Sequence, residues 1–321
     1  MIVTLIRDDR AMKDVYIETL INLANEDHNI VVLDADLMNS NSTVHFMKAH
    51  PKRAINMGVQ EANMLGAAAG LAATGKIPFS HTFSCFNTRR ALDQIYMSVA
   101  YARLNVKIVG TDPGIMAAFN GGTHMPLEDL GVVRGIPTMT VIEPVDNVMM
   151  EALIKDVAYL DGPVYLRVNR KEPMRIYAPG TKFTIGKGMT VRDGKDLTII
   201  ASGIMVAEAL QAAELLEAQG VSVRVVNIFT LKPIDRELIA RCAQETGAIV
   251  TCENHNVING LGSAVAEVLG ETHPVPLERV GVQDLFGEVG PVDYLQKRFE
   301  MTAEHIVAKV QKCLSRKTKE D

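Results

Sequence analysis

A single acidic residue stands at the start of a helix-forming segment that is made almost entirely of small residues. Glu61 precedes the run at 66–75, GAAAGLAATG, and two aromatic residues, Phe83 and Phe86, follow within TFSCF. Small side chains let another helix or a flat ligand come close, and an acidic side chain is rarely buried without a partner. We therefore interpret Glu61 as a buried acid that faces a specific ligand. The alternative is a helix-start acid that complements the helix dipole.

Other residues that could do chemistry follow apolar runs. Asp36 and Ser40, in DADLMNSNS, follow one β-branched run, and Arg170, in VNRKEP, follows another. His124 lies in a glycine-rich loop, GGTHMP, and a histidine takes up and releases protons near neutral pH. In open α/β sheets ligands bind at the carboxyl ends of the strands, so these positions are candidates for ligand binding.

The elements that position these residues form two βα series. In the first, apolar runs alternate with helical patterns and lie at 30–33, 53–57, 77–79, 106–110, 139–142 and 164–168. A second series begins at 197, after a polar segment rich in Pro and Gly at 171–194. This alternation predicts an α/β fold with two open doubly wound sheets, covered by helices on both faces. We place the domain boundary near residue 180, which gives domains 1–180 and 181–321.

Composition excludes several classes of protein. A length of 321 residues suits two domains, and a net charge of −5 gives no reason to expect a nucleic acid or an anionic membrane as partner. No apolar run reaches the roughly 18 residues of a membrane helix, and the N-terminal segment MIVTLIRDDR lacks the basic region of a signal peptide. The four cysteines are widely spaced and predict reduced thiols in a cytoplasmic protein, with no zinc site.

The central stretch carries a family resemblance. Residues 58–64, GVQEANM, the small-residue helix, and residues 82–86, TFSCF, match the pattern G-I-x-E-x-x-M followed by T-F-x-x-F. This pattern resembles the pyrimidine-binding domain of the thiamine-diphosphate-dependent transketolase family. The resemblance extends from about Arg10 to the last helix and covers the second and third domains of a full transketolase. It implies a pyrimidine-binding domain followed by a smaller transketolase C-terminal α/β domain that contributes mainly to subunit contacts.

The resemblance implies roles around the cofactor ring. Glu61 would bond N1′ of the aminopyrimidine and favour the imino tautomer, whose nitrogen takes the C2 proton of the thiazolium. Phe83 and Phe86 would stack on the ring or line it, although Phe86 is equally well explained as an ordinary core aromatic residue. Asp36 would lie beside the cofactor.

The resemblance also implies how the sugar substrate is bound. His124 would contact the donor sugar near its reacting carbonyl. Arg10, Ser40 and Arg170 would hold the phosphate of the sugar, a task that suits a guanidinium fork. Arg7 is an alternative to Arg10, surface exposure is the plain alternative for both arginines, and a turn is the alternative for Ser40.

Two positions depart from the family pattern. Asp112, in GTDPG, stands where a typical transketolase has His, and Asn120, in FNGG, stands where it has Asp. In the family the first residue helps to bind phosphate and the second reads the C2 hydroxyl of the sugar. An acid repels a phosphate, so we expect an unusual sugar phosphate or a substrate with its anionic group elsewhere. His81 matches no family role and is interpreted as structural.

The pattern that holds the diphosphate is missing from the sequence. The family uses a G-D-G motif, followed about thirty residues later by N-N, to bind Mg²⁺ and the diphosphate; neither motif occurs in the 321 residues. We therefore expect a separate N-terminal transketolase subunit carrying GDG…NN, in an α2β2 assembly with sites between subunits. The predicted reaction transfers a two-carbon ketol unit from a ketose phosphate to an aldose phosphate.

Three alternatives remain. The beta subunit of a 2-oxo-acid dehydrogenase decarboxylase has a similar layout, but Arg10, Ser40 and Arg170 argue against it. Deoxyxylulose phosphate synthase fits less well, because it is one long chain. A non-catalytic regulatory or assembly protein of the same fold is the third alternative, and the presence of Glu61, Phe83 and His124 weighs against it.

Overall fold

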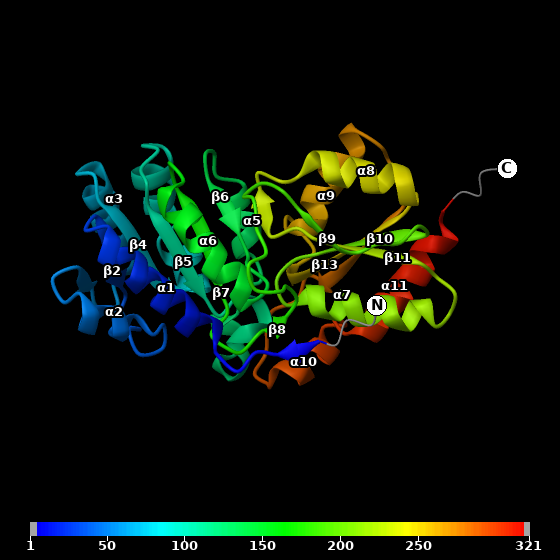
Figure 1. Cartoon of the computed structure of the whole chain (residues 1–321), viewed down its shortest axis with the longest axis horizontal. Coiled ribbons are helices and arrows are strands. Elements are labelled where there is room, and N and C mark those ends of the chain that lie inside the picture. The colour runs from blue at the N-terminus through cyan, green and yellow to red at the C-terminus, as the bar shows by residue number, and fades with distance from the viewer. Residues whose placement is uncertain (1–4, 318–321) are drawn as a thin grey trace.

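The chain folds into two α/β lobes that lie side by side (Figure 1). The computed structural model describes residues 5–317, so the first four residues of the segment MIVTLIRDDR, and the last four of the chain, lie outside it. Within the described residues no helix is long and apolar enough to cross a membrane.

The first lobe is built on a seven-stranded sheet with the order β12-β6-β7-β5-β4-β2-β3. Its six consecutive parallel strands come from the first half of the chain: β2 (Ile30–Asp34), β3 (Ala54–Asn56), β4 (Ile77–Phe83), β5 (Lys107–Thr111), β6 (Thr140–Ile142) and β7 (Val164–Val168). Strands β2, β4, β5 and β7 are buried along their whole length, as parallel strands covered on both faces require. The seventh strand, β12 (Thr230–Lys232), comes from the second half and pairs antiparallel with β6.

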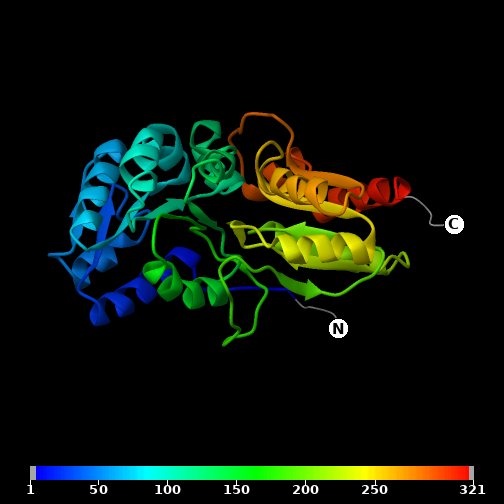
Figure 2. The ribbon, with the colours of Figure 1, turned by 90° about the horizontal axis from the view of Figure 1, so that it is seen from above.

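Helices cover both faces of this sheet, as the sequence predicted (Figure 2). One face carries α1 (Met12–Glu26), α2 (Thr43–Ala49) and α6 (Asn147–Tyr159). The other face carries α3 (Glu61–Ala73), α4 (Ser84–Arg90), the π-helical segment η1 (Gln94–Ala100) and α5 (Asp129–Arg134). The sequence at 90–102 has a helical pattern, and the structure is helical there: α4 ends at Arg90, and Gln94–Ala100 form the wider π-helical winding, a form often found at functional sites.

The second lobe has a smaller five-stranded sheet with the order β14-β13-β10-β11-β9. Its strands are β9 (Met189–Arg192), which is antiparallel, β10 (Leu197–Ala201), β11 (Val223–Asn227), β13 (Ile249–Asn256) and β14 (Leu277–Val282). Helices α7 (Met205–Glu217) and α11 (Ala303–Ser315) pack on one face, while α8 (Arg236–Thr246) and α9 (Leu261–Glu271) pack on the other. The short helix α10 (Val292–Arg298) contacts the first lobe. The strands β1 (Ile6–Arg7) and β8 (Met174–Arg175) form a separate antiparallel pair.

A buried ion network joins the two lobes. Arg167, on β7, bonds both oxygens of Asp129, with its Nε 2.8 Å from Oδ2, and its Nη1 lies 2.7 Å from Glu143. The same guanidinium donates to the backbone oxygen of Asn254 in the second lobe, and Ser202 donates to Glu143. A buried charge persists only when it is paired, so these contacts tie the second lobe to the first. The boundary predicted near residue 180 falls in the segment between β8 and β9 and stays a prediction.

Candidate active site

The buried acid lies at the first turn of α3, as its sequence context predicted. Gly58 adopts φ 72°, a left-handed conformation that glycine accepts without strain, in the turn between β3 and α3. This turn brings Glu61 to the first position of the helix, where its side chain is only 5% exposed. The partner of Glu61 is Arg90, whose Nη1 donates to Oε1 over 2.9 Å. Sequence reasoning did not identify Arg90, because nothing in its spacing links the end of α4 to the start of α3.

Two aromatic rings and a histidine gather beside this ion pair. Phe83 is the last residue of β4 and Phe86 lies in the first turn of α4, so their ring centroids are 5.9 Å apart. The ring of His124 meets both rings edge-on, at 6.1 Å from Phe83 and 5.2 Å from Phe86. The guanidinium of Arg90 covers the Phe86 ring at 4.0 Å. The structure thus brings together Glu61, both phenylalanines and His124, four residues that the sequence placed in one site.

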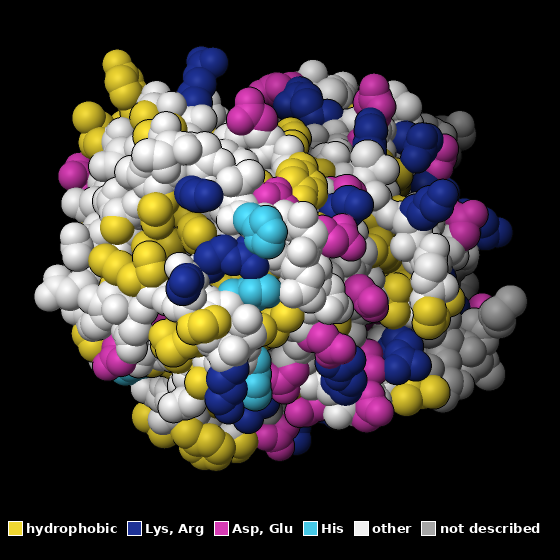
Figure 3. All heavy atoms as spheres, turned by 60° about the vertical axis from the view of Figure 1, so that its left-hand side comes forward, with side chains coloured by type: hydrophobic (Ala, Val, Ile, Leu, Met, Phe, Trp, Pro, Cys, Tyr) yellow, Lys and Arg dark blue, Asp and Glu magenta, His cyan; other side chains and the backbone are white. Residues whose placement is uncertain are grey.

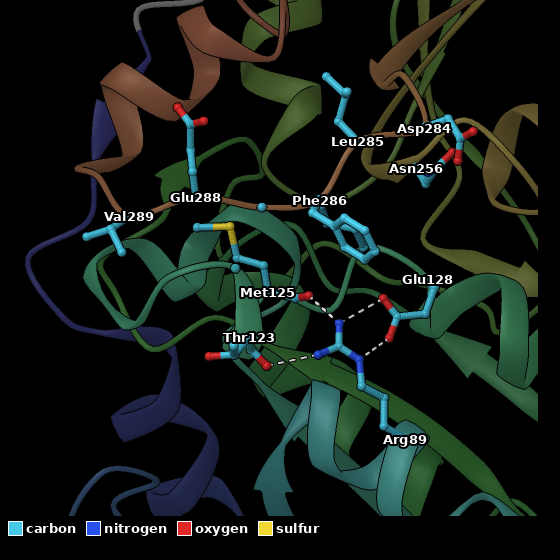
Figure 4. A pocket seen from close by; sticks show the side chains of 13 residues that line it. Arg89, Thr123, Met125, Glu128, Asn256, Asp284, Leu285, Phe286, Glu288 and Val289 are labelled. Carbon is cyan, nitrogen blue, oxygen red and sulfur yellow. Dashed lines mark hydrogen bonds and ion pairs between the residues drawn. The ribbon is translucent and has the colours of Figure 1, made fainter.

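The loop that carries His124 is fixed by an arginine that the sequence did not single out. Arg89, on α4, donates to the backbone oxygens of Thr123, at 2.9 Å, and Met125, at 2.7 Å, which flank His124 (Figure 4). Its guanidinium also pairs with Glu128, with Nη2 3.0 Å from Oε2. Thr123 Oγ1 lies 2.9 Å from His124 Nδ1, and this hydrogen bond restrains the ring.

Asp112 does not stand free as a repelling acid; it is paired with Arg170. Nε of Arg170 donates to Oδ1 over 2.6 Å, and Nη2 bonds the second oxygen. The same guanidinium lies 4.8 Å from the centre of the Phe83 ring, so this pair adjoins the aromatic cluster. Burial raises the pKa of Asp112 above its ordinary value, and Arg170, Lys171 and Lys13 oppose the rise. Asp112 is therefore paired with a cation of its own chain, and the repulsion of a phosphate that the sequence suggested stays a prediction.

Ser40 and Asp36 lie at a cavity of their own. Both line a cavity of about 390 Å³ together with Asn56, whose Nδ2 donates to Asp36 over 2.9 Å. The backbone oxygen of Ser40 accepts from Nζ of Lys13 over 3.2 Å. Lys13 is therefore a cation beside Ser40 that sequence reasoning missed, and its charge also acts on the carboxyl of Asp112. A lysine on an amphipathic helix is ordinary, and only the fold of α1 against these loops reveals its position.

Two residues that the sequence predicted to bind substrate, Arg10 and Asn120, make no described contact with the aromatic cluster. The guanidinium of Arg10 pairs with Glu18 at the surface and is half exposed. Asn120 is exposed at the end of the 3-10 segment η2 (Gly114–Asn120). Arg7, the alternative to Arg10, donates to the backbone oxygen of Glu172. Their roles stay predictions.

His81 is buried in the core of the first lobe. Its Nε2 lies 2.7 Å from the hydroxyl of Tyr16, its Nδ1 lies 3.1 Å from the backbone oxygen of Leu33, and burial lowers its pKa. These contacts agree with a structural role for this residue.

A larger cavity of about 890 Å³ opens where the two lobes meet, next to the His124 loop. Arg89, Thr123 and Met125 line it from the first lobe, and the 284–289 loop lines it from the second (Figure 4). Phe286 is 97% exposed and lies over the cavity in this view. No sequence pattern points to this loop, because it reaches the site only through the packing of one lobe on the other.

The residues fit one end of the expected cofactor. A flat nitrogen heterocycle needs an aromatic face and a buried carboxyl, and Phe86 and Glu61 offer both. Across residues 5–317 no group of three or more His, Cys, Asp and Glu side chains could hold a metal ion.

The first lobe also turns outward a face on which hydrophobic side chains adjoin Lys, Arg and His side chains (Figure 3).

Comparison with known proteins gives a consistent assignment. Residues 8–174 match the family described as transketolase, pyrimidine binding domain, and residues 186–306 match the transketolase C-terminal domain. The chain is 53% identical over 310 residues to the 6-deoxy-6-sulfo-D-fructose transketolase subunit SqwH of Clostridium sp. (strain MSTE9), covering 97% of this chain and 96% of that protein. It is 37% identical to a subunit of the apulose-4-phosphate transketolase of Phocaeicola vulgatus over 275 residues, which are 85% of this chain and 88% of that one.

A solved structure shares the whole fold. The protein is described as a split gene transketolase, inactive beta4 tetramer, and superposes with a TM-score of 0.90 at 46% sequence identity. The match covers 96% of this chain and 99% of that chain. Both lobes, and their order, therefore have counterparts in one solved protein.

Proposed function

The chain belongs to the transketolase family as the C-terminal subunit of a split transketolase, and we propose that it transfers a two-carbon ketol unit from a ketose to an aldose. Transketolases depend on thiamine diphosphate, which supplies the nucleophilic carbon. The observation that carries the proposal is one cluster of side chains, in which Arg90 contacts both Glu61 and Phe86, and the Phe86 ring packs edge-on against His124.

Glu61, Phe83 and Phe86 form the ring side of the proposed site. Glu61 would hold a proton at N1′ of the aminopyrimidine, because its carboxyl is buried and lies beside the Phe86 ring through their shared contact with Arg90. The two phenylalanines would fix the plane of the ring by stacking. Asp36 would lie beside the cofactor, as the family resemblance implies, and this role is part of the proposal.

His124 would face the donor carbonyl. Its ring meets Phe83 and Phe86 edge-on, and its loop is restrained by Arg89 and Thr123. A histidine held in this way presents a donor or acceptor at a fixed place, which suits positioning of a reacting carbonyl and proton transfer.

Arg170, Ser40 and Lys13 would bind the terminal anion of the donor, with Arg10 in a supporting role. Because Asp112 takes up the charge of Arg170, this part of the site has a smaller positive surplus than its cations alone suggest. A phosphate ester carries about −1.5 to −2 at pH 7, whereas a sulfonate carries a single negative charge. We propose that the donor is a ketose with a terminal sulfonate, as the name of the 53% identical relative states for that protein.

The partner and the metal complete the proposal. An N-terminal subunit carrying GDG…NN would bring Mg²⁺ and the diphosphate site, in an α2β2 assembly. The naming of both curated relatives as subunits supports this arrangement. The solved neighbour, a beta-only tetramer described as inactive, is consistent with a chain of this kind needing a partner.

Reconstitution tests the proposal. The chain and its N-terminal partner are mixed with thiamine diphosphate and Mg²⁺, and ketol transfer to glyceraldehyde 3-phosphate is measured from 6-deoxy-6-sulfofructose and from fructose 6-phosphate. We expect activity only in the mixture, with the sulfonate donor preferred, and only weak cofactor binding by the chain alone. Decarboxylation of a 2-oxo acid without ketol transfer would instead favour the dehydrogenase alternative. Ketol transfer by the chain alone would overturn the two-subunit arrangement.

A further inference from the structure

Arg90 makes two contacts that a bound aminopyrimidine would also make. Its guanidinium lies over the Phe86 ring at 4.0 Å and donates to Glu61 Oε1 over 2.9 Å. A flat ring stacked on Phe86, with an outer nitrogen bonded to Glu61, would have to lie in the same place. Both groups are planar, and both present N–H or nitrogen edges to the carboxyl. The guanidinium and the ring therefore compete for one position.

We propose that Arg90 is a gate for the cofactor ring: its side chain fills the ring position while the cofactor is absent and must move out before thiamine diphosphate binds. This inference rests on the proposed function, because it concerns the ring site of that cofactor. It also goes further, since it gives Arg90 a role in cofactor entry. Neither the sequence motif nor the family match points to this residue.

The electrostatics of the pair favour a gate over a permanent part of the site. Glu61 is buried, and a buried carboxylate without a partner is strongly destabilising, so the free subunit gains from the Arg90 contact. A carboxylate held by a guanidinium acts only as an acceptor, however, and the proposed chemistry requires a carboxyl that shares a proton with the ring. Removal of Arg90 from Glu61 thus vacates the ring position and gives the acid its working partner in one step.

The position of Arg90 in the chain permits this movement. Arg90 is the last residue of α4, its side chain is half exposed, and the π-helical η1 begins a few residues later. The side chain can turn toward solvent without breaking a helical hydrogen bond. Its neighbour Arg89 cannot substitute for it, because that guanidinium is occupied by Thr123, Met125 and Glu128.

Substitution of Arg90 gives opposite results for a gate and for a binding residue. The reconstituted complex with its N-terminal subunit is titrated with thiamine diphosphate in Mg²⁺ by calorimetry, for wild type, Arg90→Ala and Arg90→Lys. If the gate is closed in about nine-tenths of molecules, the apparent Kd should fall about tenfold in Arg90→Ala. Arg90→Lys should give a smaller gain, because lysine keeps the charge pair with Glu61 but cannot lie flat on Phe86. Arg241→Ala, at an exposed arginine of α8, is the matched control and should leave the Kd unchanged.

A second measurement uses the free subunit and needs no turnover. The probe is 4-amino-5-hydroxymethyl-2-methylpyrimidine, and its binding is followed by ligand-observed NMR; Arg90→Ala should bind it more tightly than wild type. Weaker or unchanged binding of both probes in Arg90→Ala would overturn the gate. If the wild-type complex performs ketol transfer while Arg90→Ala matches it in cofactor affinity, only the gate is wrong. If the wild-type complex does not bind thiamine diphosphate at all, the gate and the proposed function fall together.

Discussion

Replacement of Asp112 by asparagine should shift the donor preference of the assembled enzyme from sulfonate toward phosphate. The change removes one negative charge and keeps an oxygen that accepts from Arg170. Asp112 is almost fully buried and its carboxylate bonds two guanidinium nitrogens, so in the wild type much of the charge of Arg170 is balanced inside the chain. In the variant that charge is available to the terminal group of the donor.

The size of the shift follows from the charge and its distance. A unit charge about 5 Å from the terminal group changes its energy by about 3 kcal/mol at an effective dielectric constant of about 20. A phosphate ester carries up to about one more negative charge than a sulfonate, so the difference between the two donors changes by at most this amount. Solvent screening reduces it, because the Arg170 side chain is 21% exposed. We expect a change of about 10- to 30-fold in the ratio of kcat/KM values, or about 1.4–2 kcal/mol.

The assay compares kcat/KM for 6-deoxy-6-sulfofructose and fructose 6-phosphate in the reconstituted complex. The matched control is Asp193→Asn, which removes the acid from an ion pair with Arg224 in the second lobe, 3.0 Å apart. The double variant Asp112→His with Asn120→Asp should turn over common ketose phosphates still faster, since it restores both family residues. An unchanged donor ratio in a variant that assembles and melts like the wild type would refute the reasoning.

Three further predictions concern the ring site, the loop beside it and a buried acid on β13. Glu61→Gln should keep the assembly but slow exchange of the C2 proton of bound cofactor into heavy water by roughly 10²–10⁴-fold, because an amide cannot carry the proton; wild-type exchange would leave Glu61 as a helix-start acid. Arg89→Met should lower kcat/KM for the ketose about tenfold by releasing the carbonyls that flank His124, with cofactor affinity unchanged; an equal loss in both would contradict a role confined to this loop. Burial raises the pKa of Glu253 from 4.5 to about 7, so the folded protein holds this proton more tightly than the unfolded chain, and stability falls as pH rises from 4.5 to about 7. Glu253→Gln should flatten the decline of Tm across that range, and an unchanged slope would count against it.

Local sequence was enough to predict the elements that carry Glu61 and the aromatic rings. The β-branched runs became buried parallel strands, because a sheet covered by helices buries both faces of each strand. The small-residue segment became α3 with Glu61 in its first turn. The pair Phe83 and Phe86 could be placed together, because a strand end and the first turn of the next helix fix their spacing.

The missed features depend on contacts between residues far apart in the chain. Strand β12 crosses from the second lobe to pair with β6, although about ninety residues separate them. Lys13 approaches Ser40 and Asp112 only after α1 has packed beside their loops. The end of α4 at Arg90 and the π-helical turn that follows resemble one continuous helix in sequence, because the residues between them have ordinary helix propensity. No local pattern encodes these arrangements.

Two arginines at the aromatic cluster are paired in the same way. Arg90 is paired with Glu61 and lies on Phe86, while Arg170 is paired with Asp112 and lies on Phe83. In each case the chain supplies both the cation and the acid. The binding free energy of a ligand is therefore the difference between its own contact and the internal contact that it replaces. At Glu61 the incoming ring would displace the cation, whereas at Asp112 the incoming anion would compete with the acid for the cation. Removal of the internal partner should therefore have opposite consequences: Arg90→Ala should tighten binding of the ring, and Asp112→Asn should tighten binding of the more highly charged donor.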